Sequence, residues 1–132
     1  MSSLIREFWV FNKDGNLIAN FSDDDYLDKR LFGSFVTAIK NFCEEFNGNK
    51  LISFNLEKMK FMCVSALEGN VILVCRTSEK ENEKKIQKVS NIIRQIFESI
   101  YSVEDIKNWD GNVNFFDIFR KKLDLYFKIS DI

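Results

Sequence analysis

The stretch that decides the fold is FWVFNKDGNLIANF, residues 8–21. Asp14-Gly15 between two apolar runs is a strong signal for a tight hairpin turn. A hairpin with one face in water alternates apolar and polar side chains. The first strand of this hairpin is instead apolar on both of its faces, at Phe8, Trp9, Val10 and Phe11. We therefore expect other elements to cover both faces of the sheet that contains it.

The size and composition of the chain indicate a single globular domain over residues 1–132. The hydrophobic fraction is 45%, and 14 residues are Phe, so a substantial core is expected. The 19 basic and 20 acidic residues nearly cancel, to a formal net charge of −1, so the chain lacks the basic surface of a nucleic-acid binder. No apolar run approaches the ~20 residues that span a bilayer, which leaves at most a peripheral association with membranes.

The reactive residue types argue against catalysis. Three cysteines, Cys43, Cys63 and Cys75, each lie in an apolar run, which indicates buried free thiols in a reducing, cytoplasmic environment. The chain has no histidine, which removes His-based acid–base catalysis, serine–histidine triads and imidazole metal sites. A glycine-rich phosphate loop is also missing. We therefore expect no enzyme activity, no cofactor and no metal site.

Two charged clusters each allow a functional and a structural interpretation. Asp23, Asp24 and Asp25 could bind a divalent cation, but consecutive carboxylates diverge and are typical of a solvated loop before a helix. Arg120, Lys121 and Lys122 could contact an acidic partner or a membrane surface. They could equally lie near the negative end of a terminal amphipathic helix. We favour the structural interpretation for both clusters.

Hydrophobic periodicity predicts five strands and three helices. The strands are expected over residues 5–11, 16–21, 51–56, 60–67 and 71–76. The apolar stripe of the first helix is Phe32, Phe35, Val36, Ile39, Phe42, Cys43 and Phe46; that of the second is Ile86, Val89, Ile93, Ile96, Phe97 and Ile100; that of the third is Phe115, Phe116, Phe119, Leu123, Tyr126 and Phe127. We predict that Ser78, with Glu81 three residues on, caps the second helix and that Asn114 caps the third, with irregular backbone over residues 102–112.

The predicted element order is ββαβββαα, and its local hairpins make antiparallel strand pairs. The sequence VILVC, residues 71–75, is apolar at every position, which places the fifth strand at the centre of the sheet beside the first. The strand order is then 2-1-5-4-3, with the second and third strands at the edges. One helix covers one face and two helices cover the other. The predicted fold class is therefore α+β, a three-layer α/β/α sandwich with a five-stranded antiparallel sheet.

This element order and three stretches of local sequence resemble the longin domain. LIREFWVFNKDGNLI, residues 4–18, is similar to the opening hairpin of that family. LFGSFVTAI, residues 31–39, resembles the start of its first helix, and LISFNLEKMKFMCV, residues 51–64, resembles its third strand, turn and fourth strand. The related roadblock fold begins with a helix, so the element order favours a longin. The compact form is similar to a stand-alone, archaeal version.

The resemblance implies a longin/profilin-like fold and a non-catalytic protein-interaction module. Longins of the vesicle-SNARE class continue into a coiled coil and a membrane anchor, and we expect this chain to be a free-standing longin instead. The resemblance to such domains implies a scaffold or regulator in a small-GTPase or vesicle-trafficking system. The implied partners are another longin or roadblock domain, including a homodimer, and a small GTPase. The alternative is a small-molecule-sensing, profilin-like domain, against which the bulky Phe and Ile side chains of the core argue.

We predict that the pairing surface lies at the strand over residues 51–56 and at the outer face of the first helix. An edge strand presents backbone donors and acceptors to which a partner can add a strand. Ser53 and Asn55 lack the charges that usually blunt such an edge. The predicted partner-binding residues are Leu51, Ser53 and Asn55 of the strand and Thr37, Lys40, Asn41 and Glu44 of the helix. The structural alternative is a monomer whose edge is simply short.

Overall fold

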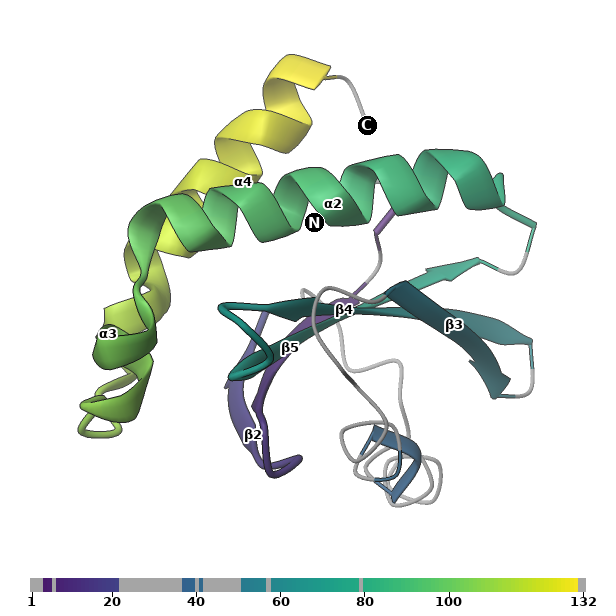
Figure 1. Ribbon diagram of the computed structural model, residues 1–132. Coiled ribbons are helices and arrows are strands. Elements are labelled where there is room, and N and C mark those ends of the chain that lie inside the picture. The colour runs from purple at the N-terminus through teal and green to yellow at the C-terminus, as the bar shows by residue number, and fades with distance from the viewer. Residues whose placement is uncertain are drawn as a thin grey trace.

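A computed structural model describes residues 4–5, 7–21, 37–39, 41, 51–56, 58–78 and 80–130. The elements are β1 (Glu7–Asn12), β2 (Leu17–Asn20), β3 (Leu51–Leu56), β4 (Met59–Ala66), β5 (Val71–Ser78), α2 (Glu83–Ile100), α3 (Val103–Lys107), the 3-10 helix η1 (Val113–Phe116) and α4 (Asp117–Ser130). The strands form one five-stranded sheet in the order β2-β1-β5-β4-β3, and every neighbouring pair is antiparallel. Helices pack on this sheet (Figure 1), so the predicted α+β class and strand order are confirmed.

The β1–β2 hairpin closes at the turn that Asp14-Gly15 predicts. The Asn12 carbonyl accepts from the Gly15 N–H at 3.0 Å, and the Asn12 Oδ1 accepts from the N–H groups of Asp14 and Asn16, each at 3.0 Å. Gly15 has a φ of 82°, in the left-handed region that costs other residues about 1–2 kcal/mol. The register of the pair shifts between Val10 and Phe11, so β2 is joined to β1 through a bulge-like irregularity.

β1 sends alternate side chains into a core on each face of the sheet. Phe8 and Val10 belong to the core that α2 and α4 cover. Trp9 and Phe11 belong to a core on the opposite face, which Ile39 joins. All five side chains are buried. Both faces of the opening strand are therefore covered, which explains why its sequence is apolar at successive positions.

Helical backbone at residues 37–39 and 41 lies on the face of the sheet opposite α2 and α4 (Figure 1). Ile39 packs there with Trp9 and Phe61. The predicted first helix is thus confirmed at these residues and on the predicted side of the sheet. The other members of its apolar stripe lie outside the described residues: Phe32, Phe35, Val36, Phe42, Cys43 and Phe46.

α2 begins later than the sequence predicts. β5 pairs with β4 as far as Ser78, which lies opposite Met59, so the sheet holds Ser78 in an extended conformation. The N-cap is Asn82, whose Oδ1 accepts from the Lys85 N–H at 3.2 Å. The predicted cap at Ser78 is therefore wrong. The predicted apolar stripe is correct. Four of its members, Ile86, Val89, Ile93 and Phe97, are buried, and the other two, Ile96 and Ile100, pack against the same core.

The segment between α2 and α4 contains more regular structure than predicted. Ser102 and Asp105 form a capping box that starts α3, with the Ser102 N–H 2.9 Å from Asp105 Oδ2 and the Asp105 N–H 3.2 Å from Ser102 Oγ. Asn112 caps η1 by accepting from the Asn114 N–H at 3.0 Å. Because this 3-10 turn precedes α4, Asn114 lies inside η1, and the predicted cap at Asn114 is wrong.

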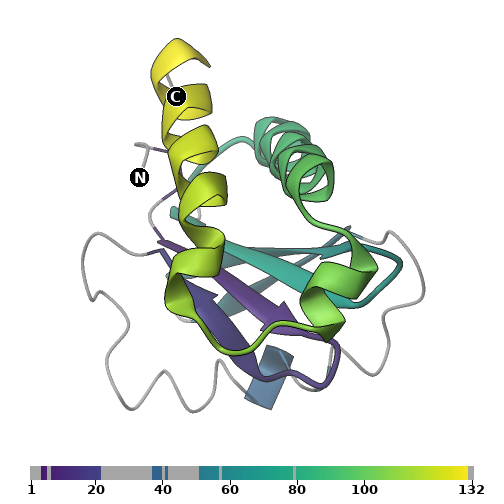
Figure 2. The ribbon, with the colours of Figure 1, turned by 90° about the vertical axis from the view of Figure 1, so that its left-hand side faces the viewer.

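Aromatic contacts join α4 to α2 and to the β1–β2 hairpin. The Tyr101 hydroxyl, at the end of α2, donates to the Phe115 carbonyl at 2.7 Å. The rings of Phe97 and Phe119 meet edge to face with centroids 5.0 Å apart, and Phe119 also lies 5.8 Å from Phe21, which follows β2. Figure 2 shows α2 and α4 next to each other above the sheet. These contacts fix the start of α4 against the sheet.

Candidate interaction surfaces

β3 is an edge of the sheet, with β4 as its strand neighbour. The β3–β4 ladder runs without a register shift from Leu51, opposite Val64, to Leu56, opposite Met59. The edge is therefore regular over six residues. Ser53 and Asn55 are exposed along it, and neither carries a charge. A regular, uncharged edge favours the addition of a strand from a partner.

The predicted partner-binding side chains lie on two sides of the sheet. The Ser53 hydroxyl donates to Glu83 Oε1 of α2 at 3.4 Å, which places Ser53 on the α2 side. Thr37 and Asn41 are exposed on the helical segment of the opposite side. Two further predicted residues, Lys40 and Glu44, lie outside the described residues. The described members of the set therefore do not form one continuous side-chain surface: Ser53 and Asn55 belong to the β3 edge, and Thr37 and Asn41 belong to the helical segment.

The other side of β3 carries apolar side chains that the sequence prediction omits. Ile52 and Phe54 are half-buried, and the Phe54 ring stacks on Phe61 with centroids 5.1 Å apart and an interplanar angle of 11°. Met59 at the start of β4 packs against the same cluster. Strict alternation in LISFNL is the sequence signal for this side. A strand added at β3 would meet polar side chains on one side and half-buried apolar ones on the other.

The buried Cys75 thiol and the buried Tyr101 hydroxyl are protonated at neutral pH. Burial raises the pKa of the Cys75 thiol to about 12, an effect that the Ser90 hydroxyl, 3.9 Å away, offsets only in part. Burial likewise raises the pKa of Tyr101 to about 12. Cys63 and Cys75 are buried free thiols, as predicted, and Cys43 lies outside the described residues. Within the described part of the chain, no three His, Cys, Asp or Glu side chains are grouped to hold a metal.

A buried ion pair joins the ends of β1 and β5. Arg76 Nε lies 3.6 Å from Glu7 Oε2, and the two residues are register partners in the sheet. Both side chains are buried. Loss of one member of such a pair leaves an uncompensated charge in the protein interior and typically costs about 3–5 kcal/mol. The geometry gives this pair a structural role inside the sheet rather than a role at either edge.

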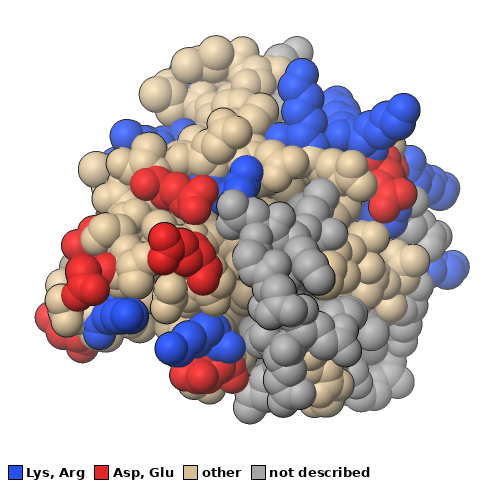
Figure 3. All heavy atoms as spheres, viewed as in Figure 1, with Lys and Arg blue, Asp and Glu red and all other residues tan. Residues whose placement is uncertain are grey.

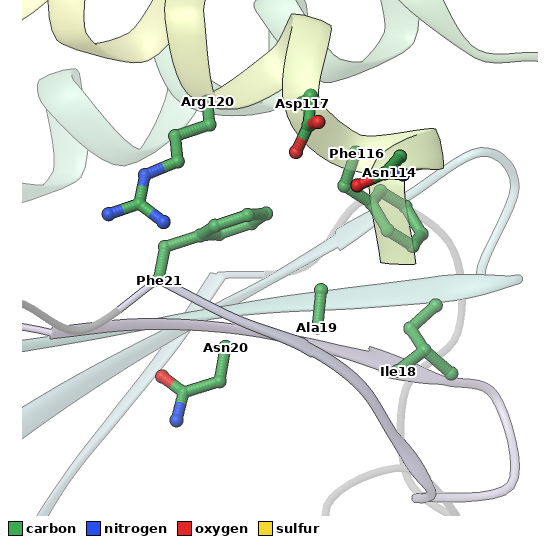
Figure 4. A pocket seen from close by; sticks show the side chains of 8 residues that line it. All are labelled: Ile18, Ala19, Asn20, Phe21, Asn114, Phe116, Asp117 and Arg120. Atoms are coloured by element: carbon green, nitrogen blue, oxygen red, sulfur yellow. The ribbon is translucent and has the colours of Figure 1, made fainter. Parts of the chain in front are cut away.

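A hollow of about 220 Å³ lies between β2 and the start of α4 (Figure 4). Its lining residues are Ile18, Ala19, Asn20, Phe21, Asn114, Phe116, Asp117 and Arg120. In Figure 4, the Arg120 side chain extends from α4 toward Phe21, and Asp117 also points down from α4 toward the sheet. Since Asp117 and Arg120 bring opposite charges, the hollow offers no matched set of ligands to an anion or to a cation.

Among the helices that the structure describes, none combines the length and the apolar character needed to cross a membrane. No protein-family model matches the chain, and a search of curated proteins also finds no match.

The fold is similar to that of solved structures. MglC from Myxococcus xanthus superposes with a TM-score of 0.53 and 19% sequence identity, over 68% of this chain and 82% of MglC. Profilin from Schizosaccharomyces pombe superposes with a TM-score of 0.51 and 12% identity, over 74% of this chain and 87% of the profilin. At these identities the likeness concerns the fold alone. The fold is therefore longin/profilin-like, while membership of the longin family and an archaeal source stay predictions.

Proposed function

We propose that this chain is a non-catalytic protein-interaction module of the longin type, a scaffold or regulator in a small-GTPase or vesicle-trafficking system. The observation that carries the proposal is the regular, uncharged edge at β3. The longin resemblance of the sequence and the longin/profilin-like fold support it. Its partners are another longin or roadblock domain, or a second copy of this chain, and a small GTPase.

Strand addition at β3 supplies backbone hydrogen bonds, and the flanking side chains supply specificity. A stable pair hides about 800 Å² on each partner, which is more than one six-residue strand provides. The flanking elements must therefore take part in the interface. The proposed contact residues are Leu51, Ser53 and Asn55 of β3 with Thr37, Lys40, Asn41 and Glu44 of the first helix.

The double variant Ser53→Lys/Asn55→Lys tests this surface, because lysines on an edge strand oppose strand addition. The full chain is immobilised and exposed to small GTPases of its source cell, each loaded with GDP or with a non-hydrolysable GTP analogue. The oligomeric state of the free chain is measured separately, by light scattering after size-exclusion chromatography. We expect the wild-type chain to retain a partner or to form a dimer, and the double variant to lose that binding. The matched control, Leu17→Lys on the β2 edge, changes an exposed residue and is expected to retain both.

Equal binding by the wild type and by the β3 double variant would remove β3 from the interface. Retention of no GTPase and of no longin-type partner, by a chain that stays monomeric at every concentration, would contradict the proposed function. A small molecule retained in native mass spectrometry would instead favour the ligand-sensing alternative.

A further inference from the structure

α4 carries apolar side chains on two opposite faces. Its inner face buries Phe119, Leu123 and Phe127 in the core. Its outer face exposes large apolar side chains: Ile118 is 51% exposed, Leu125 is 56% exposed and Ile129 is 74% exposed. Spacings of seven and four residues place these three on one stripe of the helix. Because the inner face already anchors α4, this outer stripe is not needed for the core that the structure describes.

The C-terminal half of the outer stripe adjoins a groove between α2 and α4. The groove has a volume of about 340 Å³. Its lining residues are Lys85, Lys88, Val89 and Ile92 of α2 and Tyr126 and Ser130 of α4. Tyr126 precedes Ile129 by three residues, so the wall of the groove continues into the exposed stripe. Figure 2 shows α4 rising away from the sheet beside α2.

The rim of this α2–α4 groove is basic. Lys85 and Lys88 are exposed on its α2 side, and the exposed Lys122 lies one helical turn before Tyr126 on α4. None of the described lining residues is acidic. Figure 3 shows mostly Lys and Arg where α2 begins, with Asp or Glu among them, and Asp and Glu gathered toward the end of the molecule where α3 follows α2. A chain of net charge −1 thus presents a positive field at the groove.

We propose that the α2–α4 groove binds an amphipathic helix of a partner protein whose apolar side chains are flanked by Asp and Glu. A bulky apolar side chain of that helix would enter between Ile92 and Tyr126, while its carboxylates would face Lys85 and Lys88. The groove is concave, which suits an inserted side chain better than a flat lipid surface. A second copy of this chain would bring like charges to the rim, which opposes self-pairing there. This site is separate from β3 and does not rest on the proposed function.

A designed peptide provides the probe. It has about 16 residues, Leu at positions i, i+4 and i+7, Glu on both flanks and a fluorescein label. Binding to the full chain is measured by fluorescence anisotropy. The control peptide keeps the Leu positions and replaces each Glu by Lys. We expect the acidic peptide to bind at least about tenfold more tightly than the control, and added salt to reduce that difference.

The variant Lys85→Glu/Lys88→Glu is expected to weaken binding of the acidic peptide by about tenfold or more and to strengthen binding of the Lys peptide. Its control is Lys13→Glu/Lys107→Glu, which makes the same charge change at exposed positions outside the groove. The variant Leu125→Ser/Ile129→Ser is expected to weaken the binding of both peptides. All of these side chains are exposed, and circular dichroism with thermal unfolding checks that each variant folds.

Absence of acidic-peptide binding at about 1 mM, or equal binding by the wild type and by Lys85→Glu/Lys88→Glu, would overturn the proposal. Binding to phosphatidylserine vesicles without binding of the acidic peptide would also overturn it, in favour of a membrane surface. Self-association that Lys85→Glu/Lys88→Glu abolishes would assign the groove to a second copy instead. Ser53→Lys/Asn55→Lys is expected to leave peptide binding unchanged, so a failure at the groove and a failure at β3 are distinguishable.

Discussion

β2 and β3, the two edges of the sheet, end it in different ways. β2 has four residues and shifts register against β1, whereas β3 has six residues in register with β4 throughout. Phe21, directly after β2, is 6% exposed and packs its ring 5.9 Å from Phe8 and 5.8 Å from Phe119. Phe54 of β3 stacks on Phe61 but stays half-buried.

A short, irregular edge strand whose end is anchored in the core presents little template for another strand. β2 has these protective features, whereas β3 is longer and keeps its register with β4 throughout. The contrast between the two edges therefore indicates, independently of any family resemblance, which side of the sheet is suited to strand addition.

The largest expected effect compares the anchors of the two edges. Phe21→Ala removes a buried ring and is expected to lower the free energy of unfolding by about 3–5 kcal/mol. Phe54→Ala removes a half-buried ring and is expected to cost about 1–2 kcal/mol. Urea unfolding followed by circular dichroism measures both. Equal losses would show that the two edges are anchored alike and would remove the contrast.

The next prediction concerns Cys75 in β5, the strand at the centre of the sheet. It is tested by measuring the free energy of unfolding at alkaline pH. The pKa of Cys75 is about 12 in the folded chain against an ordinary 9.0, so the folded chain keeps a thiol proton that the unfolded chain releases. Stability should therefore fall as the pH rises from about 9 to about 12, by up to about 1.4 kcal/mol per pH unit from this group. Below pH 9 the thiol adds no pH dependence. Cys75→Ala should flatten the fall, and an unchanged slope would contradict the prediction.

The turn that carries β2 gives the next effect. Gly15 has a φ of 82°, so Gly15→Ala is expected to cost about 1–2 kcal/mol. Hydrogen exchange should accelerate at the amides of β2 before those of β3, because the strain is confined to the β1–β2 hairpin. Uniform acceleration over the whole sheet would mean that β2 does not open on its own.

The smallest effect has the opposite sign and concerns the turn between β4 and β5. Glu68 is exposed and has a φ of 58°, so Glu68→Gly is expected to stabilise the chain by about 0.5–1 kcal/mol. The neighbouring Leu67 has a φ of 52°, but its side chain is buried, and glycine would remove it. Leu67→Gly should therefore destabilise the chain. Thermal unfolding of the two variants separates backbone strain from burial.

Strand order could be predicted because the apolar pattern leaves few choices. An Asp14-Gly15 turn fixes the first hairpin, and a strand that is apolar on both faces has to be central. Helix starts could not be predicted as well, because Ser and Asn cap helices about equally and the chain offers both. The pairing of Ser78 with Met59 in the sheet, a long-range contact, decides that Asn82 is the cap of α2.

For the candidate surfaces too, some features could be predicted from the sequence and others could not. Alternation along LISFNL separates Ser53 and Asn55 from Ile52 and Phe54. It does not reveal which set faces α2, so the sequence prediction joined Ser53 to Thr37 across the sheet. The outer stripe of α4 was missed because the helix is apolar on two faces, and the stronger stripe through Phe119 and Leu123 accounts for its position in the core. The seven- and four-residue spacing of the outer stripe was the available signal.

The corner that contains α3 is tied down at both of its ends. Tyr101 holds Phe115 through a 2.7 Å hydrogen bond, and Trp109 Nε1 donates to the Asn112 carbonyl at 2.9 Å. Gly111, which lies between Trp109 and Asn112 in the sequence, is exposed, and a Cβ at this position would meet no atom within 4 Å. In Figure 1 this corner lies at the far end of the molecule from β3. A fluorophore or an affinity handle inserted after Gly111 would thus leave both proposed docking surfaces unobstructed for the binding experiments.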